Sequence, residues 1–223
     1  MRLKALVTVL LFASSIAYAG VLDDFNRPNA PTLGPNWTVQ AGGGEIFNNT
    51  ARALGASESP NLLTFNGLNG SSAFVDVLAV DSSLAYLALD LAYLDVNNNY
   101  FIKVQNQGCT GGACFNYAAF YYGNNGGGSF FPLSADFTSG RITAFFTGTL
   151  ATLEIDSDFD GIADQTYSYS YAAGTGGTGI GLGLYGTAQA DNFGSGTVPE
   201  PGTMLLLGTG ISTLAAAIRR RMK

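Results

Sequence analysis

The sequence predicts an all-β fold, an antiparallel β-sandwich, on three observations. Short segments with hydrophobic side chains at every second position recur along the chain. Clusters of Gly, Asn, Ser and Pro separate these segments, and 30 of the 223 residues are glycine. No stretch between residues 21 and 197 has the period of an amphipathic helix. The pattern predicts about ten to thirteen short strands in one domain, and an up-and-down barrel is the alternative architecture.

The chain begins with the pattern of a secretory signal peptide over residues 1–19. Two basic residues precede an apolar stretch at residues 5–16, and small residues surround the expected cleavage point after Ala19. Because the apolar stretch is too short to span a bilayer comfortably, we favour a cleaved signal over an anchor helix. The mature chain is predicted to begin at Gly20 or Val21.

Alternation is clearest in two segments near the middle of the chain. Phe74–Leu78 places Val75 and Val77 on one face, and Tyr86–Leu94 places a row of leucines opposite small or acidic side chains. The Asn97–Asn99 run then predicts a turn into the next strand. Further strands are predicted at residues 100–105, 115–122, 141–146, 150–156, 167–171 and 180–185.

Two terminal motifs favour the sandwich over the barrel. Asp-Asp-Phe-Asn-Arg at residues 23–27 precedes Leu-Gly-Pro-Asn-Trp-Thr-Val at residues 33–39, and Ala-Asp-Asn-Phe-Gly stands at residues 190–194. Together these motifs resemble the opening and closing strands of bacterial concanavalin A-like lectin/glucanase domains. The resemblance implies a jelly roll of two curved antiparallel sheets, whose termini meet in the core. The residues expected there are Phe25, Trp37 and Phe193.

The last 26 residues, 198–223, have three parts in a fixed order. A Pro-Glu-Pro motif precedes the uncharged segment Gly202–Ile218, and a basic cluster follows directly. Seventeen helical residues cover roughly 25 Å, near the lower limit for a transmembrane helix. Basic residues after the helix predict that its end stays in the cytoplasm while the preceding domain is outside.

This tail resembles the PEP-CTERM sorting domain of Gram-negative bacteria that make extracellular polysaccharide. The resemblance implies that an exosortase, a membrane transpeptidase, recognises the tail and cleaves near the motif. The motif residues that this implies are Pro199, Glu200, Pro201, Arg219, Arg220 and Arg221.

The predicted organisation is therefore a signal peptide at 1–19, a β-sandwich at 20–197 and a sorting tail at 198–223. The secretion machinery and an exosortase are expected partners, and the membrane is a transient one. We expect an inner-membrane intermediate, followed by delivery to the cell envelope, the surface or the extracellular matrix.

Charge and composition restrict the function of the exported domain. Between the two signals lie four basic and fifteen acidic residues, which give a net charge of −11. Such a domain repels nucleic acid and anionic lipid and attracts divalent cations. The chain has no histidine, which excludes Ser-His and Cys-His nucleophile pairs and histidine-ligated zinc.

The two cysteines, Cys109 and Cys114, are predicted to form a structural disulfide, as is usual for neighbouring cysteines in exported proteins. A redox pair is the alternative, but it expects two-residue spacing at a helix N-terminus.

The sharpest local motif is Asp-Ser-Asp-Phe-Asp-Gly-Ile-Ala-Asp at residues 156–164. Alternating carboxylates, a glycine at position 6 and a carbonyl at position 7 are the pattern of an EF-hand-like calcium loop. The candidate ligands are Asp156, Asp158, Asp160, the Ile162 carbonyl and Asp164. Position 12 is Tyr167 instead of the bidentate Glu, so a hairpin whose Asp and Gly residues only shape a turn is the alternative.

The same region offers a candidate for catalysis. Glu154, Asp156 and Asp158 loosely resemble the Glu-x-Asp-x-(x)-Glu signature of retaining glucanases, but a shorter Asp stands at the last position. We therefore predict a protein that is not an enzyme.

Aromatic residues cluster at residues 115–122 and 130–131. An exposed subset could stack on sugars, whereas the other interpretation places alternate members in the core. The sequence thus predicts an exported, non-catalytic protein that binds polysaccharide. A secreted glycan hydrolase and a purely structural surface protein are the alternatives.

Overall fold

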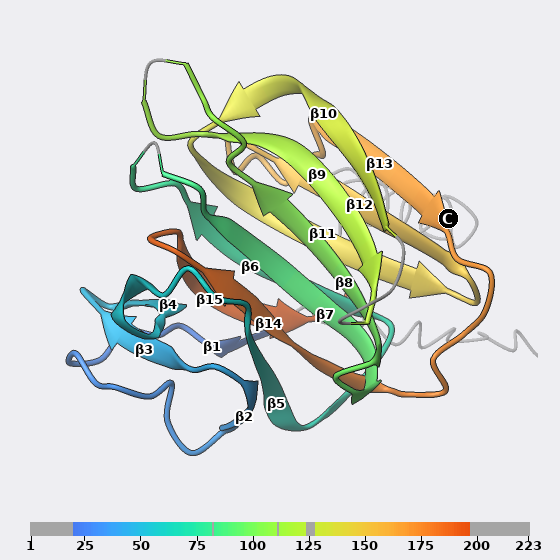
Figure 1. The fold of residues 1–223 in the computed structure, drawn as a ribbon, viewed down its shortest axis with the longest axis horizontal. Coiled ribbons are helices and arrows are strands. Elements are labelled where there is room, and N and C mark those ends of the chain that lie inside the picture. Colours follow the sequence, from blue (N-terminus) through green and yellow to red (C-terminus); the bar gives the residue numbers. More distant parts are fainter. Residues whose placement is uncertain (1–19, 82, 111, 124–127, 197–223) are drawn as a thin grey trace, which may run out of the picture.

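The computed structural model describes residues 20–81, 83–110, 112–123 and 128–196, which form fifteen strands and one short 3-10 helix, η1 (Leu54–Ala56). The strands form two antiparallel sheets that pack face to face (Figure 1). Side chains from the inner faces of both sheets make one hydrophobic core. The predicted all-β sandwich is confirmed, and the barrel alternative is wrong.

One sheet has eight strands. They are β1 (Gly20–Asp23), β3 (Gly44–Phe47), β4 (Thr50–Ala53), β6 (Ser72–Leu78), β11 (Ser139–Thr147), β12 (Leu150–Asp156), β13 (Gln165–Ser170) and β15 (Gln189–Ser195). Their order is β13-β12-β11-β6-β15-β4-β3, with β1 also paired to β15.

The other sheet has seven strands. They are β2 (Trp37–Ala41), β5 (Asn61–Asn69), β7 (Tyr86–Asp95), β8 (Asn98–Gln105), β9 (Phe115–Tyr122), β10 (Gly128–Phe137) and β14 (Gly179–Tyr185). Their order is β10-β9-β8-β7-β14-β5-β2.

Alternation along each strand divides its side chains between the core and the outer face. On β7, Leu87, Leu89 and Leu91 are fully buried in the core. On β12, Leu153 and Ile155 do the same from the other sheet. Because the period of a strand is two, the residues between them point away from the core. This division sets which side chains can meet a ligand.

The two ends of the domain meet, as the terminal motifs predicted. β1 pairs antiparallel with β15, and Gly20 lies opposite Ser195. Phe25, Trp37 and Phe193 are buried beside this pair, with the Trp37 ring centroid 4.9 Å from Phe193 and 5.9 Å from Phe25. The three residues therefore form the predicted aromatic part of the core.

The carboxylate of Asp23 explains the rest of the opening motif. It accepts hydrogen bonds from Trp37 Nε1 at 2.7 Å and from the Phe25 amide at 2.9 Å. It also pairs with the Arg27 guanidinium through both oxygens, at 2.6 and 3.0 Å. These donors lower the pKa of Asp23 against the opposing effect of its burial. The cluster ties the end of β1 to the start of β2.

The number of strands exceeds the expected ten to thirteen. Some of the additional strands are short, such as β3 and β4, and no strand was predicted at β10, which contains Pro132. The predicted strand at 167–171 runs instead from Gln165 to Ser170.

Among the described residues, no helix is long and apolar enough to span a membrane. The predicted signal peptide (1–19) and the sorting tail (198–223) lie outside the described residues.

Candidate functional site

The outer face of the seven-stranded sheet carries a row of small side chains interrupted by one lysine. Strand pairing aligns Ala119 of β9, Lys103 of β8, Ala88 of β7 and Gly183 of β14 across the sheet. Paired residues of antiparallel strands share a face and lie side by side. The neighbours of Lys103 within this row are therefore too small to cover it, and side chains of the adjacent rows bury it instead.

Aromatic rings stand on both sides of this row. Tyr86 and Tyr185 occupy the next row on one side and stack with centroids 5.0 Å apart. Phe101 and Tyr121 occupy the next row on the other side. Tyr86 and Phe101 meet edge to face across the small residues, with centroids 5.6 Å apart. Ala88 and Ala119 are fully buried, so the flanking rings cover the small row.

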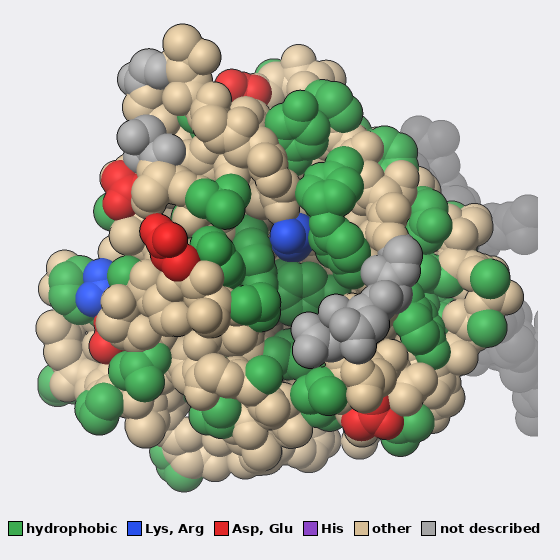
Figure 2. Space-filling view, in the orientation of Figure 1, with side chains coloured by type: hydrophobic (Ala, Val, Ile, Leu, Met, Phe, Trp, Pro, Cys, Tyr) green, Lys and Arg blue, Asp and Glu red, His purple; other side chains and the backbone are tan. Residues whose placement is uncertain are grey.

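Beside these rings lies a hollow of about 210 Å³, whose lining includes Lys103, Tyr86, Phe101 and Tyr121. Figure 2 shows this face, with a basic side chain in a depression surrounded by hydrophobic side chains. The hollow combines apolar walls with a polar group, which is the usual composition of a small-molecule site.

The position of the Phe101 ring depends on glycine at Gly183. A Cβ at that position would lie 2.1 Å from Phe101 Cζ and 3.0 Å from the Ala88 side chain. The ring can therefore extend across β7 onto β14 only because β14 has no side chain there. The alternation of Gly with Leu in β14 thus shapes the hollow.

Lys103 is the charged group of the hollow. Its side chain is only 9% exposed, and its Nζ lies 4.2 Å from the centroid of Tyr86 and 5.0 Å from that of Tyr121. No carboxylate among the described residues lies within 4 Å of Nζ. Burial lowers the pKa of Lys103 to about 8, so the amine is still mostly protonated at neutral pH.

Asp90 is a second buried charge-bearing group on this sheet. It lies in register with Phe101 and Gly181, is fully buried, and neither carboxylate oxygen has a hydrogen-bond partner among the described residues. Burial raises the pKa of Asp90 well above its usual value. A protonated, neutral Asp90 is the form that this environment favours.

The predicted calcium loop connects β12 and β13. Carboxylate oxygens of Asp156, Asp158 and Asp164 lie within 4.8 Å of one another. Asp156 uses one oxygen to accept the Gly161 amide at 2.9 Å, while its other oxygen is buried without a partner among the described residues. Three of the four predicted carboxylate ligands are thus brought together.

Asp160 does not belong to this group of three. Its carboxylate accepts a hydrogen bond from the Ile162 amide at 2.8 Å, which is a turn within the loop. Asp164 accepts hydrogen bonds from the amide and hydroxyl of Ser157, at 2.8 and 2.5 Å, and these bonds lower its pKa. The loop therefore also has turn contacts of the kind that the alternative interpretation expects.

The residues considered for catalysis lie on the other sheet. Glu154 is on β12 between the buried residues Leu153 and Ile155, and so points to the outer face of the eight-stranded sheet. Asp158 follows the end of the strand. Only Glu154 and Asp156 lie on the strand, so the three carboxylates do not form one row. None of the three lines the hollow.

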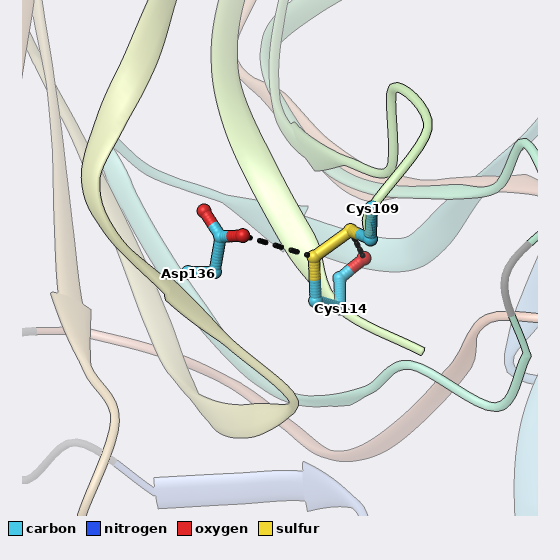
Figure 3. Close-up of side chains that lie close together, drawn as sticks. All are labelled: Cys109, Cys114 and Asp136. Carbon is cyan, nitrogen blue, oxygen red and sulfur yellow. Dashed lines mark hydrogen bonds between the residues drawn. A yellow bond between two sulfur atoms is a disulfide. The ribbon is translucent and has the colours of Figure 1, made fainter. Parts of the chain in front are cut away.

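The predicted disulfide is present between Cys109 and Cys114, whose Cα atoms are 5.9 Å apart (Figure 3). Asp136 of β10 points toward it, with Oδ2 3.5 Å from Cys114 Sγ. Bonded sulfurs are not the thiolates that a metal requires, so this cluster is structural. It links the segment after β8 to the start of β9.

The carboxyl-terminal tail decides how the chain is sorted. Residues 197–221 match the model of the PEP-CTERM protein-sorting motif. The chain carries a PEP-CTERM sorting signal. The match includes the Pro-Glu-Pro motif and the arginine cluster that the sequence singled out, and it indicates an exported protein that passes the membrane before cleavage by an exosortase.

The sandwich domain is compared through its structure, because no curated protein matches the chain in sequence. The exoplasmic/lumenal domain of VIP36 in its Ca²⁺-bound form is similar with a TM-score of 0.50 and 9% identity, over 80% of this chain and 90% of that chain. This likeness shows the fold, a lectin/glucanase-type sandwich.

Two further similar structures are of bacterial origin. The carbohydrate-binding module CBM66 from Bacillus subtilis has a TM-score of 0.47 and 15% identity, over 71% of this chain and 93% of that one. The β-glucanase of Bacillus licheniformis has a TM-score of 0.45 and 10% identity, over 78% and 95%.

Sequence reasoning missed Lys103 and Asp90. Period-two alternation could have placed both on the outer face of their strands, since each stands between core residues. It could not show that two alanines and a glycine from other strands lie beside Lys103, because strand order and register decide that. The aromatic cluster divides as both interpretations expected, with Phe120 in the core and Tyr121 outside.

Proposed function

We propose that this chain is an exported, non-catalytic polysaccharide-binding protein that holds glycan in the hollow of the seven-stranded sheet. Residues 20–197 form the binding domain, residues 1–19 direct export, and the tail directs exosortase-dependent sorting to the envelope or the extracellular matrix. The observation that carries the proposal is the hollow itself, with Lys103 between the rings of Tyr86 and Tyr121.

The chemistry of the hollow suits a sugar. A pyranose has apolar C–H faces and polar edges, and aromatic rings bury the faces while leaving the edges to hydrogen bonds. Tyr86, Phe101 and Tyr121 offer such rings. The ammonium of Lys103 offers donors to a ring substituent. The tight ring contacts around Lys103 hold these groups in place before a ligand arrives, which lowers the ordering cost of binding.

A non-catalytic role is supported by where the carboxylates lie. Glycoside hydrolysis generally needs two carboxylates on either side of the scissile bond. None is among the described residues that line the hollow. Glu154 and Asp156 belong to the opposite sheet. We therefore place binding, without bond cleavage, in the hollow.

The test is binding of the purified domain to extracellular polysaccharides, compared between Tyr121→Ala and Phe159→Ala. Phe159 is a matched control, an aromatic residue that is 52% exposed in the loop after β12 and outside the hollow. Removing one stacking ring is expected to weaken binding about ten-fold. Phe159→Ala is expected to bind like the native domain.

Two outcomes would contradict the proposal. Equal effects of the two substitutions would mean that glycan does not enter the hollow. Hydrolysis of β-glucan by the native domain that is lost in Glu154→Gln would favour the hydrolase instead.

We also propose that the loop between β12 and β13 binds Ca²⁺ through Asp156, Asp158 and Asp164. The observation that favours it is the convergence of three carboxylates, one with a buried oxygen that lacks a partner among the described residues. A calcium ion takes six to eight oxygens, so the ion would also draw on backbone carbonyls and water.

Calcium that binds only the folded domain must raise its melting temperature. We expect a higher melting temperature in millimolar Ca²⁺ than in chelator, and no such difference for Asp158→Asn. Asp95→Asn is the control, because Asp95 caps a turn between β7 and β8 by similar hydrogen bonds. A melting temperature of the native domain that is unaffected by chelator would remove the calcium proposal.

A further inference from the structure

Lys103 differs from every other basic residue in the described part of the chain. The three arginines there each have a carboxylate partner: Arg27 with Asp23 at 2.6 Å, Arg52 with Glu45 at 2.8 Å, and Arg141 with Asp76 at 2.6 Å. Lys103 has no such partner although it is the most buried of the four. Lysine is almost never buried unless it is paired.

We propose that the missing partner belongs to the ligand, and that the hollow selects a polysaccharide whose sugar units carry a carboxylate. This inference rests on the proposed function and names its substrate class. A uronate unit would stack on the aromatic rings and place its carboxylate against Lys103 Nζ.

The physical reason is the cost of a buried, unpaired charge. Taking an ammonium out of water is unfavourable, and the faces of Tyr86 and Tyr121 offset only part of that loss. A carboxylate that docks beside Lys103 makes a charge-assisted hydrogen bond in a poorly solvated site, where such bonds are strong. A neutral sugar hydroxyl can accept a hydrogen bond there but leaves the charge uncompensated.

No acidic group of the hollow can take this role. The described lining residues include no Asp or Glu. On β7, Lys103 pairs with Ala88, and Asp90 lies two residues further along the same strand. Asp90 and Lys103 nevertheless form no ion pair. Three of the described lining residues are aromatic, and none besides Lys103 is basic. Lys103 alone would therefore recognise the carboxylate of the ligand.

The net charge of −11 of the domain opposes approach of an anionic polymer at long range. Ions screen that repulsion over roughly 10 Å at 0.1 M salt. The contact at Lys103 is short and buried, so it is screened much less. Selectivity for the acid therefore has to come from the hollow and not from the surface field.

The experiment compares each of three uronate polymers, polygalacturonate, polymannuronate and hyaluronate, with its own carboxyl-reduced form. Carboxyl reduction keeps the linkage and removes the charge. The native domain is expected to bind at least one acidic polymer ten-fold or more tightly than its reduced form, measured by calorimetry at 0.1 M salt.

Lys103→Met and Lys103→Arg complete the design, with folding checked by thermal melting. Met keeps the length and removes the charge, so we expect it to abolish the preference for the acidic form. Arg keeps the charge and is expected to retain part of the preference. A preference that survives in Lys103→Met overturns the inference.

The remaining outcomes separate this inference from the proposed function. Equal binding of the acidic and reduced forms, weakened by Tyr121→Ala, overturns the inference and leaves glycan binding standing. Absence of binding to every polymer by the folded native domain counts against both.

Discussion

Lys103, on β8 of the seven-stranded sheet, lowers the stability of the folded domain. In the folded domain its pKa is about 8, whereas the ordinary value is 10.5. The unfolded chain therefore binds this proton more tightly, so at pH 7 the charge of Lys103 disfavours folding, and stability rises as the pH moves from about 8 to 10.5.

The first prediction follows from this sign. At pH 7, Lys103→Met is expected to raise the free energy of unfolding by about 1–3 kcal/mol, because it removes a buried, unpaired charge. Burial raises the pKa of both Tyr86 and Tyr121, so both rings keep their protons at pH 7. Thermal or urea unfolding at pH 7 and pH 10 measures the gain, which should shrink at the higher pH.

Arg141→Met serves as the control for that prediction. It removes a cation that is paired with Asp76 through two bonds, and leaves a half-buried carboxylate. It is expected to lower stability. If Lys103→Met lowered it as well, the view of Lys103 as an uncompensated charge would be wrong.

Asp90 gives a second prediction of pH dependence. Because its pKa is raised in the folded domain, the folded state keeps a proton that the unfolded chain loses above about pH 4. Because of Asp90, the free energy of unfolding therefore falls as the pH rises from 4 toward neutral. In Asp90→Asn that loss should disappear.

The measurement for Asp90 is the difference between the unfolding curves of the two proteins at several pH values from 4 to 8. Paired carboxylates such as Asp23, whose pKa is lowered, act in the opposite direction in both proteins and cancel in the difference. Parallel pH profiles of the two proteins would mean that Asp90 has the same pKa in the folded and unfolded states, and would contradict this prediction.

At the residue scale, the sequence predicted what local chemistry decides. Phe25, Trp37 and Phe193 are in the core as their motifs implied, and the cysteines are bonded. Lys103 and Asp90 went unnoticed, because their importance depends on which strands lie beside them. A strand sequence gives the face of a residue but not its neighbours on that face.

Among the elements, the strands with clear alternation were predicted within a few residues. The short strands β3 and β4 were not, since four residues around the Asn48-Asn49 turn are too few to show a period. Both interpretations of residues 156–164, a calcium loop and a hairpin turn, placed a loop where the structure has one between β12 and β13. Its predicted ligand Asp160 instead closes the turn itself, which one-dimensional spacing cannot show.

The disulfide joins two nearby points of the chain, and its effect on the free energy of unfolding is expected to be small. The Cys109–Cys114 bond closes a loop with a sequence separation of five residues. The chain-entropy model gives about 2 kcal/mol for a loop of that size. Replacing both cysteines by serine is expected to reduce the free energy of unfolding by about that amount, measured by urea unfolding.

Reduction of the native domain is the matching experiment for the disulfide. A reducing agent should lower the stability of the native domain to that of the double variant, and should leave the variant unchanged. Loss of folding in the variant would mean that the bond holds more of the sheet than its own loop.

For the whole molecule, two sheets, their packing and the sorting tail were predictable, because alternation and terminal motifs extend over the full chain. The hollow was not, because it is made by strands from distant parts of the sequence, β7, β8, β9 and β14. The hollow on the outer face of the seven-stranded sheet could therefore be recognised only once the strand order was known.

Sorting gives the prediction at this scale. In cells with an exosortase, mass spectrometry of the mature protein should find a C-terminus near Pro199–Pro201 and an N-terminus at Gly20 or Val21. Without the exosortase, the protein should retain Arg219–Arg221. Mature protein that keeps these arginines in both strains would contradict exosortase processing.

The pairing of β1 with β15 has a consequence for maturation. Since Gly20 lies opposite Ser195, the polypeptide enters and leaves the sandwich at adjacent points. Trimming before Gly20 or after Ser195 removes none of the strands that the structure describes. The pairing of the described strands therefore does not depend on whether either end is cut before or after the domain folds.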